Sequence, residues 1–413
     1  MYAGMIMLVA ALSAGPFISD VELVTVTDSG FAISFVTAGE SEATVLYGTD
    51  RDNLEGRANS GPGKFHHIEV DALLPGTEYY YRVESGESGW PSRLLSAKRV
   101  RTLTPPPGEH LFTFAVMNDI HVGEDVAGLI TLPLPGTPTL TPGFDWPDED
   151  DQYWDFTLRA TVEEINASEA ELAVVNGDLT ADFLPEQFQL AKEMLDRLEA
   201  PYYVVRGNHD RVEKFPEDYF EKTFGLDESW YSFDQGGVHF TVLDDSRLAD
   251  GWHGFPKEEW EWLERELESH RDVPVIIFSH RPIGASWSDV NKKIRKRMLA
   301  LFSQHPQIIA VFNAHSHRAN IVTVPDYTGD TPYFEVPSVK EYPTGYALIE
   351  VYEGGLMYNF HLTDCDKCLE WNNTTRGQYF GTAPRRMMRK VEHRNSAYEF
   401  PPEKSALVEA AAR

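Results

Sequence analysis

The sequence is poor in cysteine. Its 413 residues contain only two, Cys365 and Cys368, in the segment "CDKC". A zinc ribbon needs a second pair of thiolates, so this kind of structural zinc site is excluded. The pair is compatible with a disulfide that closes a small loop, with a redox pair or with two ordinary thiols, and we favour a structural role.

Basic residues are also scarce. Lys and Arg together number 36, against 65 Asp and Glu, which gives a formal net charge of −29. Nucleic-acid polymers and anionic membranes both require a basic face, so neither is expected as the main partner. A small phosphorylated substrate is still compatible with this charge, because bound metal ions can reverse the field inside a site. The simplest interpretation of the acidity is solubility.

The N-terminal segment contains no Lys or Arg before Arg51. Residues 1–15, "MYAGMIMLVAALSAG", are apolar and then small, as in a signal peptide, but the positive charge that normally precedes the apolar core is missing. We interpret 1–15 as an apolar leader or a signal segment. A signal segment would imply a periplasmic or extracellular protein, and otherwise we expect a cytoplasmic one. No other run is long enough for a membrane span.

Residues 16–104 have the pattern of an all-β domain. Short alternating runs such as "VELVTV", "FAISFV", "ATVLYG" and "EYYYRV" are separated by turn signals such as "TDSG" and "LPGT". Six or seven short strands in about ninety residues predict a small β-sandwich. Residues 105–109 form a proline-rich linker.

Residues 110–362 alternate short apolar strands with long helical patterns, which predicts an α/β domain. Helices are expected near 154–168 and at "PEQFQLAKEMLDRLEA", "PKEEWEWLERELESH" and "VNKKIRKRMLALFSQ". The remaining segment, 363–413, is predicted to be a C-terminal extension. In it, "DCDKCLEWNNTTRGQYFG" has the composition of a loop. The basic run "PRRMMRKVEHR" could bind a partner, but a solvated helix face that docks on the acidic body is the preferred interpretation.

Five of the apolar runs end in polar side chains that can bind metal ions. Ligands bind beyond the carboxyl ends of the strands in open α/β sheets, so these side chains should meet at one edge of the fold. Each motif alone is weak, since a Gly-Asp after a strand is most often a turn and a lone His is most often structural. The joint pattern is difficult to produce by turn chemistry. It comprises Asn118, Asp119 and His121; Asn176 and Asp178; Asn208, His209 and Asp210; His280; and Asn313, His315 and His317.

Two divalent cations about 3.5–4 Å apart can hold a phosphoryl group and activate a water molecule. Their mutual repulsion requires an anionic bridge, so one carboxylate must touch both ions. Mixed imidazole, carboxylate and amide ligands suit Mn, Fe or Zn better than Ca. The strand-end residues therefore predict a dinuclear site.

The motifs resemble those of the calcineurin-like metallophosphoesterase superfamily, D-x-H, G-D, G-N-H-D/E, H and G-H-x-H, over roughly residues 111–361. The resemblance implies an α/β/β/α sandwich that hydrolyses phosphodiesters or phosphomonoesters with two Mn, Fe or Zn ions. It implies that a metal-bound hydroxide attacks phosphorus while His209 stabilises the transferring group or protonates the leaving oxygen. The implied ligands are Asp119, His121 and His317 for the first metal; Asn208, His280 and His315 for the second; and Asp178 as the bridge.

The N-terminal domain also resembles known modules. "LPGTEYYYRV" is similar to the tyrosine-bearing late strand of fibronectin type III domains, and a β-sandwich of this kind precedes the catalytic domain of purple acid phosphatases. This resemblance implies a fibronectin III-like sandwich that acts as a spacer or a wall.

Two positions depart from the superfamily pattern. Ala314 stands where Gly commonly precedes the first His of the last motif, which is tolerable if its φ is negative. Ala181 stands where purple acid phosphatases have a Tyr that binds ferric iron, so no ferric-tyrosinate centre is expected. Protein phosphatases have at this position an Asp that orients the catalytic His. The partner of His209 is therefore left open between Asp210 and Asp182.

Residues 122–153 form a long insertion that begins beside Asp119 and His121. Loops of this length in a compact domain are often functional. Its aromatic residues could stack on a base, a sugar or an aryl group, but a small satellite core that holds the loop down is the preferred interpretation. These aromatic residues are Phe144, Trp146, Tyr153 and Trp154.

The leading hypothesis is a metal-dependent hydrolase of a small phosphorylated substrate. One alternative is a non-catalytic binding or adhesion protein that acts through its β-sandwich. Loss of a metal ligand would have favoured it, but every ligand position is filled. A second alternative is a metallohydrolase of a non-phosphate substrate, with which the ligand set is also compatible.

Overall fold

The computed structural model describes residues 18–85, 96–128, 143–148, 150–212, 217–246, 255–285 and 290–413. The leader 1–15 and most of the central part of the insertion, 129–142, lie outside these ranges. The chain divides into two compact units. One contains residues up to Leu23 and Ser29–Thr102, and the other contains Val24–Asp28 and Leu103–Arg413. No helix in the described ranges is both long and apolar enough to cross a membrane.

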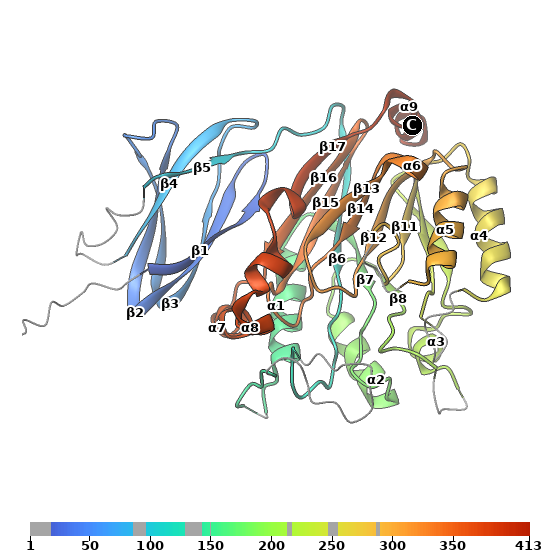
Figure 1. The fold of residues 1–413 in the computed structure, drawn as a ribbon, viewed down its shortest axis with the longest axis horizontal. Helices are drawn as coiled ribbons and strands as arrows, with labels where there is room; N and C mark the ends of the chain where they lie inside the picture. The colour runs from blue at the N-terminus through green and yellow to red at the C-terminus, as the bar shows by residue number, and fades with distance from the viewer. Residues whose placement is uncertain are drawn as a thin grey trace, which may run out of the picture. The chain divides into compact units, whose positions relative to one another are not determined.

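The N-terminal unit is all-β, as predicted, and its described residues form five strands, of which β2 and β3 are longer than expected (Figure 1). The predicted strands "FAISFV" and "ATVLYG" are two halves of one strand, β2, whose register with β3 shifts between Val36 and Ala43. The sheet order is β1-β2-β4-β5, with β3 also paired to β2. The strands are β1 Ile18–Val26, β2 Phe31–Gly48, β3 Gly56–Val70, β4 Glu78–Ser85 and β5 Lys98–Arg101.

The second unit contains two six-stranded sheets, with the orders β17-β16-β15-β6-β7-β8 and β13-β14-β12-β11-β10-β9. The first sheet consists of β6 His110–Met117, β7 Ala170–Asn176, β8 Tyr202–Val205, β15 Gly345–Tyr352, β16 Gly355–Leu362 and β17 Asn395–Glu399. The second consists of β9 Tyr231–Gln235, β10 Val238–Val242, β11 Val275–Phe278, β12 Ile308–Asn313, β13 Asn320–Val324 and β14 Gly329–Glu335. Strands β6, β7 and β8 pair in parallel, as do β10, β11, β12 and β14.

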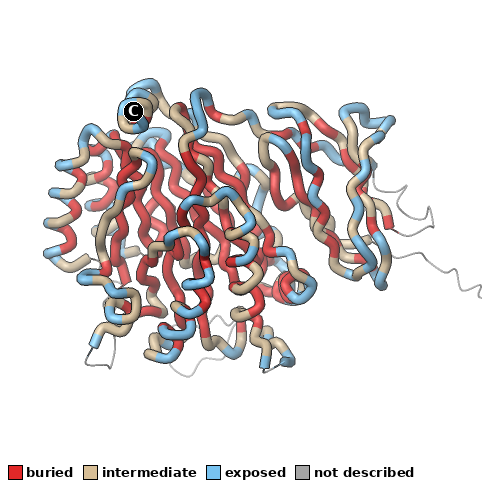
Figure 2. The backbone as a smooth tube through the Cα atoms, turned by 180° about the vertical axis from the view of Figure 1, so that it is seen from behind, coloured by how far each residue is buried: buried red, intermediate tan, exposed pale blue. Residues whose placement is uncertain are grey.

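Alternating side chains of each central strand lie in different cores, which produces four layers. In β6, Phe112 and Phe114 pack between the two sheets, whereas Ala115 and Met117 pack on the opposite face. Helices α1 (Tyr153–Ala167) and α2 (Pro185–Leu195) cover this outer face, and α4 (Lys257–Ser269) and α5 (Lys292–Phe302) cover the outer face of the other sheet. Buried residues therefore run along the central strands (Figure 2). The predicted α/β/β/α sandwich and its four long helices are confirmed.

The prediction of a loop at "DCDKCLEWNNTTRGQYFG" was wrong. Asp366–Thr375 form helix α7, because Cys368 and Trp371 on one face pack into an aromatic cluster with α1. Cys365 and Cys368 form a disulfide at the start of this helix, and the structural role favoured for the pair stays a prediction. The other helical segments are α3 Tyr219–Phe224, α6 Pro325–Thr328, α8 Gln378–Gly381, α9 Pro402–Ala411, a π-helix at Pro384–Met388 and a 3₁₀ turn at Val391–His393.

The aromatic residues of the insertion form the satellite core that we preferred over a stacking surface. Tyr153 is fully buried and stacks on Trp371, with ring centroids 4.5 Å apart. Phe144, Trp146 and Trp154 pack around this pair. The cluster fixes both ends of the insertion to α1 and α7.

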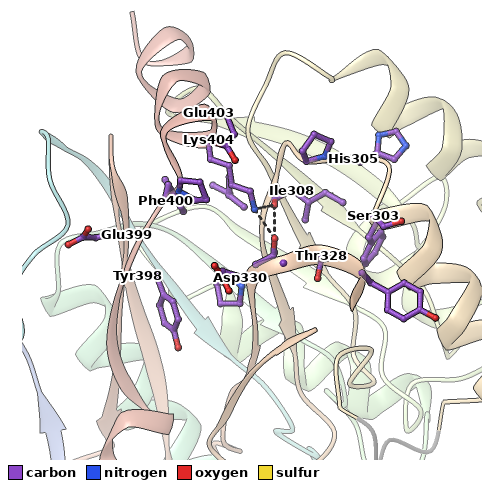
Figure 3. Close-up of a pocket in the computed structure, with 18 residues that line it drawn as sticks. Ser303, His305, Ile308, Thr328, Asp330, Tyr398, Glu399, Phe400, Glu403 and Lys404 are labelled. Carbon is purple, nitrogen blue, oxygen red and sulfur yellow. Dashed lines mark hydrogen bonds between the residues drawn. The ribbon is translucent and has the colours of Figure 1, made fainter. Parts of the chain in front are cut away.

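Helix α9 covers the end of the second unit at which β12 and β14 begin. Its Lys404 side chain reaches the first residues of both strands. Nζ donates to the Ile308 carbonyl and to Thr331 Oγ1, each at 2.7 Å (Figure 3). The two strands are therefore held at their starts by a C-terminal helix that sequence patterning left unassigned.

Candidate metal centre

The carboxyl ends of the parallel strands bring the polar motifs of the sequence together. The turn after β6 is bonded to the turn after β7, because Asp119 N and Ile120 N donate to the carbonyl oxygens of Gly177 and Asp178, both at 2.9 Å. The turn after β11 is bonded to the one after β12, with Ala314 N donating to His280 O at 2.8 Å. Adjacent strand ends are thus cross-linked through their backbones.

The turns at these strand ends are strained and tightly packed. Positive φ values of 50–64° occur at non-glycine residues, a conformation that costs on the order of 1 kcal/mol or more each and persists only where the surroundings enforce it. The residues concerned include Asp119, His121, Asp178, His315 and His317. Ala314 is not among them, which explains why alanine is tolerated before His315.

Two glycines are required by close approach. A Cβ atom at Gly177 would lie 2.3 Å from Nδ1 of His280, and one at Gly207 would lie 2.2 Å from Oδ1 of Asp178. Neither contact is sterically possible, so these glycines allow the strand ends to converge. Backbone strain and close packing of this kind are typical of a functional site.

The first ligand group comprises Asp119, His121 and His317, whose ligand atoms lie within 4.8 Å of one another. Nε2 of His317 is 3.2 Å from Oδ1 of Asp119. The second group comprises Asp178, His280 and His315, again within 4.8 Å. Asp178 joins the two groups, because its Oδ2 lies 3.2 Å from His280 Nε2 and 3.5 Å from His121 Nε2.

The donor atoms of this cluster fit two cations. Among the described residues, several buried atoms of this cluster have no hydrogen-bond partner, which is costly unless another group satisfies them. They include Asp119 Oδ1, His121 Nε2, Asn208 Oδ1 and His280 Nε2. Two imidazole nitrogens, a carboxylate oxygen and an amide oxygen form a donor set that suits Mn, Fe or Zn.

The charges of the cluster also favour cations. Burial would raise the pKa of Asp178, but His280 and the other nearby histidines outweigh it and hold that pKa well below its usual value. Burial would lower the pKa of His280, but Asp178 outweighs it and raises the pKa to about 10. Asp119 has the same effect on His317, whose pKa also rises to about 10. The carboxylates thus attract positive charge to the centre, and metal binding would displace these protons.

A second set of residues orients the ligand side chains, and none of these residues was predicted from the sequence. Glu341 lies 2.6 Å from Nδ1 of His317 and also accepts a hydrogen bond from Gln378 at 2.8 Å. Lys340 is buried and donates to Glu124 at 2.6 Å, and Glu124 lies 3.6 Å from Nδ1 of His121. Lys340 and Glu341 follow the end of β14, so a search of strand ends that included "TPYFEV" would have found them.

Asn118 orients the other carboxylate. Its side-chain amide donates to Asp119 Oδ2 at 2.6 Å and to the carbonyl oxygens of Val336 and Pro337. It therefore fixes the Asp119 carboxylate relative to the segment after β14.

The interpretation of Asp210 or Asp182 as the partner of His209 was wrong. Nδ1 of His209 lies 2.7 Å from the Ala181 carbonyl oxygen, so the backbone orients the ring. The buried Asp210 carboxylate instead accepts hydrogen bonds from the backbone N–H groups of Leu179, Thr180 and Gly207 at 2.9–3.0 Å. Asp210 therefore ties the turn after β7 to the turn after β8 and makes no contact with the His209 ring.

A cavity of about 210 Å³ opens over the centre. His121, Asp178, Asn208, His209, His315 and His317 line it. Asp119 and His280 lie behind it and are fully buried. His209 is partly exposed, and its ring centroid lies 4.4 Å from that of His121. The centre thus has an open side that His209 borders.

Comparison with known proteins agrees with this geometry. A family model described as calcineurin-like phosphoesterase matches residues 112–319, just over half of the chain, and a purple acid phosphatase N-terminal domain model matches residues 18–96. A probable glycerophosphodiester phosphodiesterase of Arcobacter nitrofigilis is 30% identical over 157 residues, which cover 36% of this chain and 58% of that protein.

Two further relatives also match this chain over part of their length. A glycerophosphodiester phosphodiesterase of Enterobacter lignolyticus is 29% identical over 182 residues, 40% of this chain and 64% of that protein. Purple acid phosphatase 22 of Arabidopsis thaliana is 22% identical over 323 residues, 69% of this chain and 62% of that protein. The chain therefore spans about three fifths of the length of each of these relatives. With its strand-end motifs gathered at one edge and matched in order, the chain belongs to the calcineurin-like phosphoesterase family.

Proposed function

We propose that the protein hydrolyses esters of phosphate at a dinuclear metal centre. One observation supports this proposal above all others: the Asp178 carboxylate lies between the two ligand groups, with Oδ2 3.5 Å from His121 Nε2 and 3.2 Å from His280 Nε2, as a bridge between two cations requires. The names of the relatives, phosphodiesterases and purple acid phosphatases, agree with it.

Each ligand has a proposed place. Asp119, His121 and His317 would hold one cation, and Asn208, His280 and His315 the other, with Asp178 shared. Two bound cations would supply a nucleophile from water at neutral pH and neutralise charge on the phosphoryl oxygens. Mn, Fe and Zn are the proposed metals, and Ala181 leaves no tyrosinate ligand for ferric iron.

His209 is the proposed catalytic acid. A carbonyl oxygen only accepts hydrogen bonds, so the contact with Ala181 assigns the proton of the His209 ring to Nδ1. Nε2 is then available on the cavity side, where a protonated ring donates to the oxygen that leaves phosphorus. Asp210 would support this step indirectly, because it holds the turn that contains His209.

The first experiment measures metal content and turnover. Protein reconstituted with Mn²⁺ is expected to hold about two metal equivalents and to hydrolyse bis-p-nitrophenyl phosphate. The absence of bound metal, together with no activity on aryl mono- or diesters, would show that the protein is not this kind of enzyme.

The second experiment separates chemistry from metal binding. His209→Ala is expected to lower turnover by about 10²–10⁴-fold while the metal content stays unchanged. His110→Ala, which removes an exposed ring at the start of β6, is the matched control and should leave both quantities unchanged. Loss of metal in His209→Ala would mean that His209 is a ligand.

A further inference from the structure

A second cavity shares a wall with the metal cavity. Its volume is about 780 Å³, and His315, Ser316 and Tyr379 line both cavities. A molecule whose ester lies at the metal centre can therefore extend past these three residues into the second cavity.

The second cavity is basic in an otherwise acidic chain. Four of its eight lining residues are arginines, and none is Asp or Glu. The whole chain has a net charge of −29. A cavity wall with four cationic side chains and no carboxylate is therefore unusual for this sequence. The arginines are Arg318, Arg385, Arg386 and Arg389.

Two of these arginines, Arg385 and Arg386, are not held by a polar side chain within the described residues. Arg318 pairs with the buried Glu335 at 3.2 Å, and Arg389 donates to Asn320 at 2.6 Å. The guanidinium of Arg386 lies over the Tyr379 ring, 5.4 Å from its centroid. Within the part of the chain that the structure describes, neither Arg385 nor Arg386 has a carboxylate oxygen within 4.0 Å. Both side chains are exposed and available to an anion.

The local fold holds these two side chains outward. The segment Pro384–Met388 buries Met387 and Met388, and the Met387 carbonyl accepts a hydrogen bond from Ala319 N at 2.8 Å. Ala319 follows the last metal motif by two residues, so the arginine segment is bonded directly to the segment that contains His315 and His317. The basic run that resembled a solvated helix face is thus attached to the site.

We propose that the arginine-lined cavity binds a second phosphate group of the substrate, so that the enzyme acts on esters that contain a further phosphate. The proposal rests on the proposed function. Arginine binds phosphate through two parallel N–H donors, and a cavity wall that presents several guanidinium groups suits a dianion. The acidity of the remaining chain disfavours a polyanion such as a nucleic acid, whose backbone would extend beyond the patch.

The test compares two inhibitors that differ only in the second phosphate. Propyl phosphate and propane-1,3-diol bisphosphate, together with the six-carbon pair, are measured as inhibitors of bis-p-nitrophenyl phosphate hydrolysis. In the unmodified protein, at least one bisphosphate should bind about tenfold or more tightly than its monophosphate, because hydrogen bonds to charged groups are the strong ones. In Arg385→Ala/Arg386→Ala, this ratio should fall to about one.

Controls distinguish binding from folding. The kcat/KM for bis-p-nitrophenyl phosphate should remain within about twofold in the double variant, and Lys292→Ala/Lys293→Ala, which removes two exposed charges from α5, should keep the bisphosphate ratio. Arg386→Lys retains the charge but loses the paired donors and should lie in between. Equal inhibition by the mono- and bisphosphates in the unmodified protein, or an unchanged ratio in the double variant, would overturn the proposal.

The failure of the proposed function is distinguishable from this result. Calorimetric titration of the metal-loaded protein with the same two probes measures binding without turnover. If no ester is hydrolysed but the bisphosphate still binds more tightly through Arg385 and Arg386, the anion site stands and the catalytic proposal fails.

Discussion

Two buried lysines lie beyond opposite ends of strand β14, and they show how differently the two ends of the sheet treat charge. Lys340 follows the carboxyl end and is 3% exposed, and Lys404 binds at the amino end and is 8% exposed. Lys340 donates to the Glu124 carboxylate at 2.6 Å, and Glu341 is its neighbour. Within the described ranges, Lys404 donates to two neutral oxygens and forms no ion pair.

The different partners shift the two pKa values in opposite directions. Burial would lower the pKa of Lys340, but Glu124 and Glu341 outweigh it and the pKa is raised. Burial lowers the pKa of Lys404 to about 8, and the nearby Glu403 and Asp330 do not offset it. Charge is therefore compensated at the metal-centre end, where ligands must be held in position, and uncompensated at the end where a lysine only anchors a helix.

The largest effect is expected at the carboxylate that both ligand groups share. Asp178→Ala should abolish two-metal binding and reduce activity to background, because the two cations would lose the anion between them. Metal content and bis-p-nitrophenyl phosphate hydrolysis measure this effect. Asp196→Ala removes an exposed carboxylate on the same sheet's helical side and should change neither. Two retained metals in Asp178→Ala would show that the bridge lies elsewhere.

The next largest effect concerns stability. Lys340→Met should lower the free energy of unfolding by about 3–5 kcal/mol, because it removes the buried cation that compensates the Glu124 and Glu341 carboxylates. Denaturant unfolding measures the change. Adding Glu124→Gln should recover part of it, because one uncompensated charge is then removed. If Lys340→Met costs no more than Lys404→Met, the comparison between the two ends fails.

A smaller effect is expected for the carboxylate that orients His317. Burial would raise the pKa of Glu341, but Lys340 and His317 lower it to about 2, so the group is a carboxylate at neutral pH. Glu341→Gln keeps the shape and removes the charge, and it should weaken metal affinity by about 10–100-fold. Metal titration measures this affinity. Glu259→Gln, a buried change outside the centre, should leave metal affinity unchanged even if it lowers stability.

The sequence predicted the metal-centre end of the sheets better than the end that α9 covers. The apolar runs "FTFAVM" and "QIIAVF" located β6 and β12, and the residues after them are the ones that the structure gathers. Strand ends can be predicted in this way because the apolar run and the polar residues that end it are both local features of the sequence. The strand end before Glu341 could also have been found in this way, but its contact with His317 and the orientation of His209 by the Ala181 carbonyl could not, because both contacts join segments far apart in the chain.

The C-terminal segment illustrates the same limit. Its helix α7 exists because Trp371 packs on Tyr153, more than two hundred residues earlier, and its own composition favours a loop. Helix α9 likewise depends on Lys404 reaching β12 and β14. Contacts between distant segments overrode local propensity in both helices.

The smallest effect is expected at Lys404, and it depends on pH. The pKa of this amine is about 8 in the folded protein and 10.5 ordinarily, so the fold penalises the protonated form. The penalty is complete below pH 8 and disappears as the pH rises toward 10.5. The unmodified protein should therefore gain stability relative to Lys404→Met by on the order of 2 kcal/mol between about pH 8 and 9.5. Denaturant unfolding of both proteins at each pH cancels titrations that they share, including those of Glu403, Asp330 and the metal-centre histidines. A difference that stays constant across this range would mean that Lys404 is compensated after all, and the two ends of β14 would then treat buried charge alike.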